Sequence, residues 1–114
     1  MDAKLKAKWV EALRFGEYRQ STRQLRKLEA DGHVAYCCLG VLCEVAHLSR
    51  HGEFYAGPFG DKSMTQLPMS FARSIGLAHS DSVIYGGKRV CLTTLNDDVG
   101  LSFKEIAALI EEQL

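Results

Sequence analysis

Apolar residues recur with the period of an α-helix in the first and the last segments of the sequence. Over residues 3–15 the apolar side chains fall on one helical face, and Asp2 and Gly16 stand where an N-terminal cap and a C-terminal stop are expected. In the last segment, Ser102 and Glu105 have the S-x-x-E spacing of a capping box, and apolar residues at helical spacing follow them. Both segments are therefore predicted to be amphipathic helices.

Two other segments have the pattern of β-hairpins. Asp31-Gly32 separates the alternating runs LRKLEA and HVAYCC, and Gly86-Gly87 divides the run SVIYGGKRVCLTTL. Such dipeptides favour tight hairpin turns because both turn positions need positive φ angles. The two hairpins are expected to join in one small antiparallel sheet. The inward-facing positions expected in the first hairpin are Leu28, Ala30, Val34 and Tyr36.

The middle of the chain contains a helical pattern without a polar face. Between residues 39 and 48, Glu44 is the single charge, and a helix that is apolar all round is a buried helix. Gly40 destabilises a helix interior, so we expect another backbone to approach it closely. Residues 49–66 are rich in glycine, serine and charge, which predicts a long mobile loop, and residues 67–77 predict a short helix.

Length and composition fit one globular domain, taken as residues 1–114. The chain is 46% hydrophobic and 25% charged, as ordinary soluble domains are. The expected fold class is α+β, with a small antiparallel sheet of two hairpins packed with about four helices, one of them central and buried. No apolar run approaches the roughly 20 residues of a membrane span. The first residues lack the apolar stretch of a signal peptide, so we expect a cytoplasmic protein with reduced cysteines.

The charges are unevenly distributed although the net charge is zero. Residues 1–29 carry eight Lys or Arg against four Asp or Glu, and the remaining residues carry six against ten. A solvated helix face is the simpler interpretation of this asymmetry. The alternative is a basic patch that meets an acidic partner or a phosphate backbone. Nucleic acid is the weaker choice of partner because the whole chain is neutral.

The segment YCCLGVLCEVAH holds three of the four cysteines and a histidine. A zinc site usually needs a second pair of ligands, which the sequence lacks, and no metal or other cofactor is expected. Free cysteine is among the most buried residue types, so packed core is the favoured interpretation. The expectation is that Cys37, Cys38 and Cys43 are buried.

A catalytic interpretation of the same segment stays open. Cys38 stands at the predicted start of a helix, where the helix dipole stabilises a thiolate nucleophile. A base and an orienting group would be needed, and His79 with Asn96 or Asp97 follow in the chain. His33 and His51 are equally eligible as the base. This alternative is a cysteine-dependent hydrolase or transferase.

Four runs of the sequence resemble a family of small proteins of unknown function in bacteria and their phages. The runs are KWVEALRFGEYRQSTRQL, YCCLGVLCEVA, LPMSFARSIGL and LTTLNDDVGLSFKEIAALIEEQL. The family has a helix that ends in a G-x-Y-x-Q turn, a CCLGVLC-type segment and a C-terminal LND…SF-x-EIA helix. Arg23 departs from the family pattern, which often has glycine there, and the stretch between Asn96-Asp97 and Ser102 is slightly longer. The resemblance implies a small accessory protein carried on a phage or prophage and implies no particular activity.

The function expected from these observations is binding without catalysis. The partner would be a host protein, with its inhibition as one outcome, and no membrane would take part. Aromatic and arginine side chains are enriched at such interfaces. The residues expected at the binding surface are Arg14, Tyr18, Arg19, Gln20, Arg23 and Arg26, with Phe54 and Tyr55 from the 49–66 loop. Phe59 is a further aromatic residue of this loop, and the alternative is that these aromatic side chains fold back as a lid over the core. A structural role is the simpler interpretation for Tyr18, Gln20 and Asn96-Asp97, the last pair as an Asx-turn.

Overall fold

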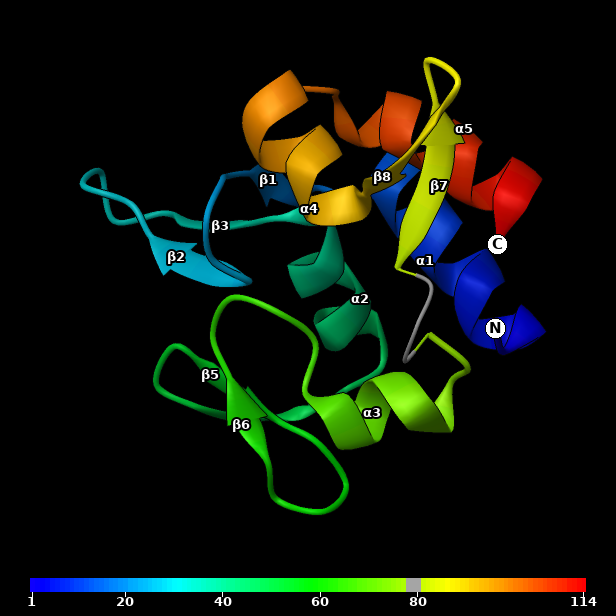
Figure 1. Ribbon diagram of the computed structural model, residues 1–114. Helices are drawn as coiled ribbons and strands as arrows, with labels where there is room; N and C mark the ends of the chain where they lie inside the picture. Colours follow the sequence, from blue (N-terminus) through cyan, green and yellow to red (C-terminus); the bar gives the residue numbers. More distant parts are fainter. Residues whose placement is uncertain (78–80) are drawn as a thin grey trace.

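The first and last helices of the chain lie side by side (Figure 1). In the computed structural model, which describes residues 1–77 and 81–114, α1 (Ala3–Phe15) packs against both α5 (Phe103–Gln113) and α2 (Cys38–Val45). The Asp2 carboxylate accepts a hydrogen bond from the backbone N–H of Leu5 at 3.0 Å, and the capping box at the start of α5 is complete. Both helix predictions are confirmed, and the overall α+β class is confirmed as well.

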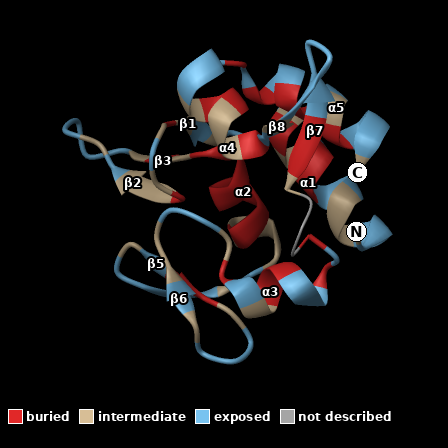
Figure 2. Cartoon of the chain, viewed as in Figure 1, coloured by how far each residue is buried: buried red, intermediate tan, exposed pale blue. Residues whose placement is uncertain are grey.

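Helix α2 occupies the centre of the core, as its apolar sequence predicted (Figure 2). Its residues from Cys38 to Cys43 are all buried. A Cβ atom added at Gly40 would lie 1.7 Å from the carbonyl oxygen of Leu25, so the expected close approach of another backbone is confirmed. The indole N–H of Trp9 donates to the carbonyl oxygen of Cys38 at 2.9 Å and joins α1 to α2.

The strands form three separate small sheets instead of one. In chain order they are β1 (Arg19–Gln20), β2 (Arg26–Leu28) and β3 (Val34–Tyr36); β4 (Ser49–His51), β5 (Phe54–Ala56) and β6 (Lys62–Ser63); and β7 (Ser82–Tyr85) and β8 (Lys88–Cys91). The expectation that the two hairpins share a sheet was wrong. The physical reason is that β8 runs directly into α4 (Leu92–Thr94), which packs on α2, while β7 packs on α5.

The first hairpin forms where it was predicted but with a different turn and a different inward face. Strands β2 and β3 pair with Leu28 opposite Val34, so the connection is longer than two residues, and only Gly32 in it has a positive φ, of 85°. Leu28 is 62% exposed, and Ala30 is also exposed. The side chains of this region that are buried in the core are instead Leu25 and Ala35. A shift of one position moves a strand residue to the other face of the sheet, which explains the error.

The second hairpin and the short third helix match their sequence signals. Gly86 and Gly87 have φ angles of 60° and 78°, as a two-residue hairpin turn requires. Helix α3 (Met69–Ser74) starts directly after Pro68, and Gly76 after it has a φ of 81°.

Two loop predictions were wrong. Residues 49–66 form the antiparallel sheet β4–β5–β6 rather than a long loop, since its strands are too short to show alternation in the sequence. The residues after β8 are helical: α4 continues into a π-helical turn, η1 (Leu95–Val99), which ends at Gly100. Asn96 therefore lies inside a helical turn and not in an Asx-turn that starts a loop.

Candidate functional site

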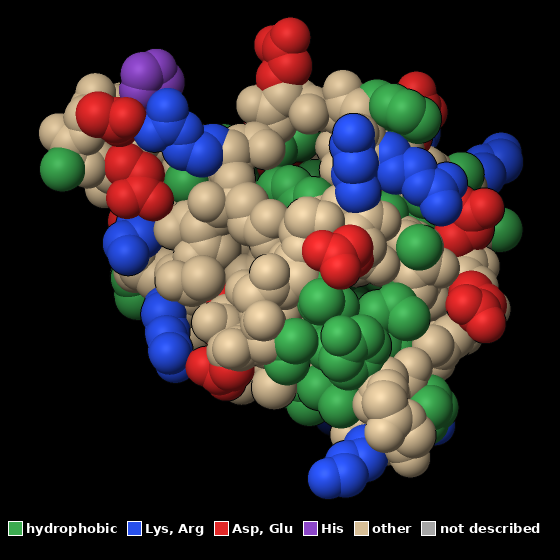
Figure 3. Space-filling view, turned by 90° about the horizontal axis from the view of Figure 1, so that it is seen from above, with side chains coloured by type: hydrophobic (Ala, Val, Ile, Leu, Met, Phe, Trp, Pro, Cys, Tyr) green, Lys and Arg blue, Asp and Glu red, His purple; other side chains and the backbone are tan. Residues whose placement is uncertain are grey.

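All four arginines of the basic segment form ion pairs within the chain. The pairs are Arg14 with Glu111, Arg19 with Asp31 at 2.6 Å, Arg23 with Asp98 at 3.2 Å, and Arg26 with Glu53 at 3.0 Å. Acidic and basic side chains accordingly lie beside one another on the face seen in Figure 3. The segment does not present four free guanidinium groups on one side, because each has a carboxylate partner from another part of the chain.

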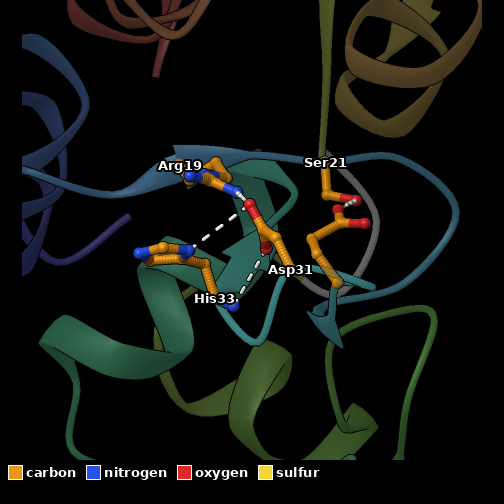
Figure 4. A network of polar contacts seen from close by, with 5 residues as sticks. Arg19, Ser21, Asp31 and His33 are labelled. Carbon is orange, nitrogen blue, oxygen red and sulfur yellow. Dashed lines mark hydrogen bonds and ion pairs between the residues drawn. The ribbon is translucent and has the colours of Figure 1, made fainter.

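The Arg19 pair belongs to a small polar network on the first hairpin (Figure 4). The Asp31 carboxylate accepts hydrogen bonds from the Arg19 guanidinium and from the backbone N–H of His33 at 3.0 Å. These bonds lower the pKa of Asp31 to about 2. Next to them, the hydroxyl of Ser21 donates to Glu29 at 3.0 Å. The network fixes the hairpin turn against β1, which is a structural role.

Tyr18 and Gln20 also hold the segment in place. The rings of Tyr18 and Tyr36 meet edge to face with centroids 5.3 Å apart. The Gln20 amide donates to the side-chain oxygen of Asn96 at 2.9 Å and to the carbonyl oxygen of Leu101 at 2.8 Å. The simpler structural interpretation of these two residues therefore agrees with their contacts.

Asn96 is the centre of a buried polar junction that sequence reasoning missed. Its side chain is 2% exposed. Its oxygen accepts hydrogen bonds from the Cys38 backbone N–H at 3.2 Å and from Gln20, and its amide donates to the Ser21 carbonyl and to Asp97, both at 2.8 Å. The one sequence signal was the position of Asn96 directly after the run VCLTTL. The junction joins η1, β1 and the start of α2.

The buried cysteines have the surroundings of packed core. Cys37, Cys38 and Cys43 are buried, as expected. The thiol of Cys38 is fully buried and lies 3.6 Å from the carbonyl oxygen of Leu92, and burial raises its pKa well above the usual value. The negative charge of Asp97 raises the pKa further. These features favour core packing over nucleophilic catalysis, while His79 lies outside the described residues.

The described residues were also compared with the requirements of a metal site. Within residues 1–77 and 81–114, no group of three His, Cys, Asp or Glu side chains is placed to hold a metal ion. Across the same part of the chain, no helix is long and apolar enough to cross a membrane.

The aromatic residues of the segment 49–66 have different positions. Tyr55 is fully buried, and its hydroxyl donates to Glu44 at 2.6 Å, so it is not available to a partner. Strand alternation turns the neighbouring Phe54 outward. Phe59 is 92% exposed at the tip of the β5–β6 connection. It is the most exposed of the large hydrophobic side chains in the described part of the chain.

The backbone that carries Phe59 is held firmly. The N–H of Gly60 donates to the carbonyl of Gly57 at 3.0 Å, and the N–H of Gly57 donates to the carbonyl of Asp61 at 2.8 Å. Gly60 has a φ of 85°, which glycine adopts without strain. The Asp61 carboxylate accepts hydrogen bonds from the backbone N–H and the hydroxyl of Ser70 in α3. The turn is thus attached to the first turn of α3 while its aromatic side chain points into solvent.

A shallow hollow lies beside Phe59. Its volume is about 280 Å³, and Phe59, Met69 and Arg73 line it together with the Asp61–Ser70 pair. Met69 is exposed, and Arg73 forms no ion pair with any described residue. Exposed apolar side chains therefore lie next to an unpaired cation here. We name Phe59, Met69 and Arg73 the Phe59 surface.

Comparison with known proteins places the chain in a family. A family model described as a domain of unknown function, DUF8296, matches residues 1–66, which run from α1 to the end of the β4–β5–β6 sheet. No curated protein and no solved structure matches the chain. The expectation of a family of unknown function is confirmed, and the matched segment covers more than half of the 114 residues. The chain belongs to the DUF8296 family.

Proposed function

We propose that the protein acts without catalysis, by binding another protein through the Phe59 surface. The observation that carries the proposal is a phenylalanine 92% exposed on a firmly held turn. An exposed aromatic side chain contributes nothing to the core, and aromatic anchors dominate the energy of protein interfaces. The turn is already ordered by its own hydrogen bonds, so binding would lose little conformational entropy there.

The chemistry of the Phe59 surface indicates what the partner offers. Phe59 projects outward, so the partner needs an apolar pocket that receives the ring. Arg73 is exposed, and Lys62 in the adjoining strand β6 is exposed too. Acidic side chains at the rim of the partner's pocket would complement these cations and speed association at low salt.

The biological setting is part of the proposal. The resemblance to small bacterial and phage proteins supports an accessory protein of a phage or prophage whose partner belongs to the host. Occupation of a functional surface of that host protein would inhibit it. The turn that carries Phe59 suits such a role, because one exposed aromatic side chain on an ordered backbone can fill one pocket of a larger protein.

The test begins with site-specific cross-linking. A photo-reactive benzoylphenylalanine is placed at position 59, and in a control protein at position 28, since Leu28 is also exposed but lies in a different sheet. Bacterial host lysate is irradiated with each protein, and cross-linked proteins are identified by mass spectrometry. A partner of the Phe59 surface is cross-linked from position 59 and not from position 28.

The affinity measurement decides the matter with purified partner. Phe59→Ala removes a ring whose burial is worth about 2 kcal/mol, so the dissociation constant should rise about 30-fold. Leu28→Ala is the matched control and should leave the affinity unchanged. Both variants should unfold at the parent temperature because both side chains face solvent. Equal affinity of Phe59→Ala and parent for every cross-linked protein would refute the proposal.

A further inference from the structure

A second hollow lies where two helices end. Its volume is about 450 Å³, and it is bordered by the last turn of α1 and the last turn of α2. Phe15, Tyr18, Glu11 and Glu44 contribute most of its distinctive chemistry, and Lys8 and His47 also line it. This hollow shares no lining residue with the Phe59 surface.

Two aromatic side chains form walls of the hollow. Phe15 is 78% exposed at the end of α1. The Tyr18 ring packs over Gly16, where an added Cβ atom would lie 2.9 Å from the ring, so this wall is fixed by close packing on the backbone. Tyr18 also makes the edge-to-face contact with Tyr36. Aromatic faces of this kind attract cations through their quadrupole.

The electrostatics of the hollow also favour a cation. The Glu44 carboxylate is held from the core side by the buried Tyr55 hydroxyl, and Glu11 forms no ion pair with a described residue. Burial raises the pKa of both Tyr18 and Tyr55, and the negative charge of Glu44 raises it further. The C-terminal ends of α1 and α2 carry partial negative charge, which adds to the charge of the two carboxylates. Lys8 is the one lysine or arginine that lines the hollow, against two carboxylates.

The backbone at the end of α2, which borders the hollow, is in a left-handed conformation. His47 has a φ of 56°, in the left-handed region that favours glycine. It follows α2 in a Schellman ending, in which the N–H of His47 donates to the Glu44 carbonyl at 3.0 Å and that of Leu48 to the Cys43 carbonyl at 3.2 Å. Glycine would fill this position with less strain.

We infer that the hollow at the ends of α1 and α2 binds a guanidinium cation, presented by an arginine side chain of another polypeptide. A guanidinium stacks flat on aromatic rings and donates paired hydrogen bonds to carboxylates, which matches Phe15 and Tyr18 beside Glu11 and Glu44. A compact ammonium ion lacks the planar face that such stacking needs. The inference does not rest on the proposed role of Phe59, because no residue is common to the two surfaces.

The experiment is a titration of the isotope-labelled protein followed by amide NMR. The probe is Nα-acetylarginine methylamide, and the neutral control of the same shape is the corresponding citrulline compound. Arginine should shift the amide signals of residues 15–18 and 45–48 in a saturable manner with a millimolar dissociation constant, while citrulline should not. The guanidinium could come from a polypeptide or from a free small molecule. Agmatine, a free guanidinium amine, distinguishes these two sources. Weaker binding of agmatine than of the arginine probe assigns the site to a polypeptide, and tighter binding overturns that assignment.

Charge variants within the hollow make the test sharper. Glu11→Gln, on the exposed face of α1, should weaken arginine binding about tenfold, as the loss of one charged hydrogen bond implies. Glu44→Gln keeps an acceptor for the Tyr55 hydroxyl and should also weaken arginine binding about tenfold. Lys8→Gln should strengthen binding, because it removes the one competing cation. Phe59→Ala should have no effect. Absence of saturable shifts in the hollow, equal binding of citrulline, or weaker binding by Lys8→Gln would overturn the inference.

Discussion

Replacement of Asn96 by alanine should be among the most destabilising single changes outside the apolar core. The Asn96 side chain makes four hydrogen bonds and is almost fully buried. Two of its partners are backbone groups, the N–H of Cys38 and the carbonyl of Ser21. The Cys38 N–H belongs to the first turn of α2, where no preceding helical carbonyl can accept it. In the alanine variant these groups stay buried without the asparagine.

The magnitude follows from the number of groups left unpaired. A buried donor or acceptor that loses its partner costs about 1–3 kcal/mol, so two backbone groups cost about 4 kcal/mol together. The Gln20 amide also loses Asn96, but it keeps its hydrogen bond to the Leu101 carbonyl, so it adds a smaller loss of stability. A domain of this size is stable by about 5–15 kcal/mol. The change should therefore remove a large share of the stability and lower the melting temperature by roughly 15 °C.

The assay is urea unfolding of the parent, Asn96→Ala, Gln20→Ala and the double variant. Because Gln20 and Asn96 are in direct contact, their effects should be non-additive, with a coupling of about 1 kcal/mol. Asn96→Asp is a control of equal shape. The carboxylate of the introduced aspartate would face the Ser21 carbonyl and Asp97, which raises its pKa in the folded state. The stability of Asn96→Asp should therefore fall further below that of the parent as the pH rises. An Asn96→Ala loss below about 1 kcal/mol would refute the reasoning, because a single buried unpaired group already costs that much.

Four further predictions concern other parts of the chain. Arg23 has a φ of 76°, so Arg23→Gly should raise stability by about 1 kcal/mol in urea unfolding despite losing the exposed pair with Asp98; a lower midpoint would contradict this. In native protein, a thiol reagent should modify Cys91 alone among the four cysteines, and Cys43→Ala should cost about 1 kcal/mol through a small cavity. The pKa of Asp31 falls from 3.8 to about 2 on folding, so its stabilising effect is present above pH 4 and is lost toward pH 2. The melting temperature should therefore fall less over that interval in Asp31→Asn than in the parent.

Local signals in the sequence were sufficient for much of the fold. Helices α1 and α5 have caps and apolar faces that depend on residues a few positions apart. Gly40 indicated the close approach of another backbone, and Gly86-Gly87 indicated a turn with positive φ angles; the structure has both. The sheets were harder to predict. Strands of two or three residues are too short to display alternation, which is why β4, β5 and β6 were mistaken for a loop.

The candidate site could be predicted in part, since a sequence shows charges and aromatic residues but not what covers them. The arginines of the basic segment looked like a free patch until their partners, such as Glu111 for Arg14, were known from the fold. In the run FYAGPF, Tyr55 turned inward and Phe59 stayed outside, and only the strand and turn geometry separates the two. Asn96 was overlooked as a junction because its partners come from three distant segments.

The packing of α1 against α5 constrains how the chain is made. The ribosome releases α1 first, yet α5, which it packs against, is synthesised roughly 90 residues later, about 5–20 seconds at ordinary elongation rates. During that interval α1 can pack on α2, to which Trp9 is hydrogen-bonded, but the face of α1 that packs on α5 remains uncovered on the nascent chain. The segment matched by the family model, residues 1–66, contains α1 and α2 but not α5. Expressed alone, it would carry a helix without the neighbour on which it rests.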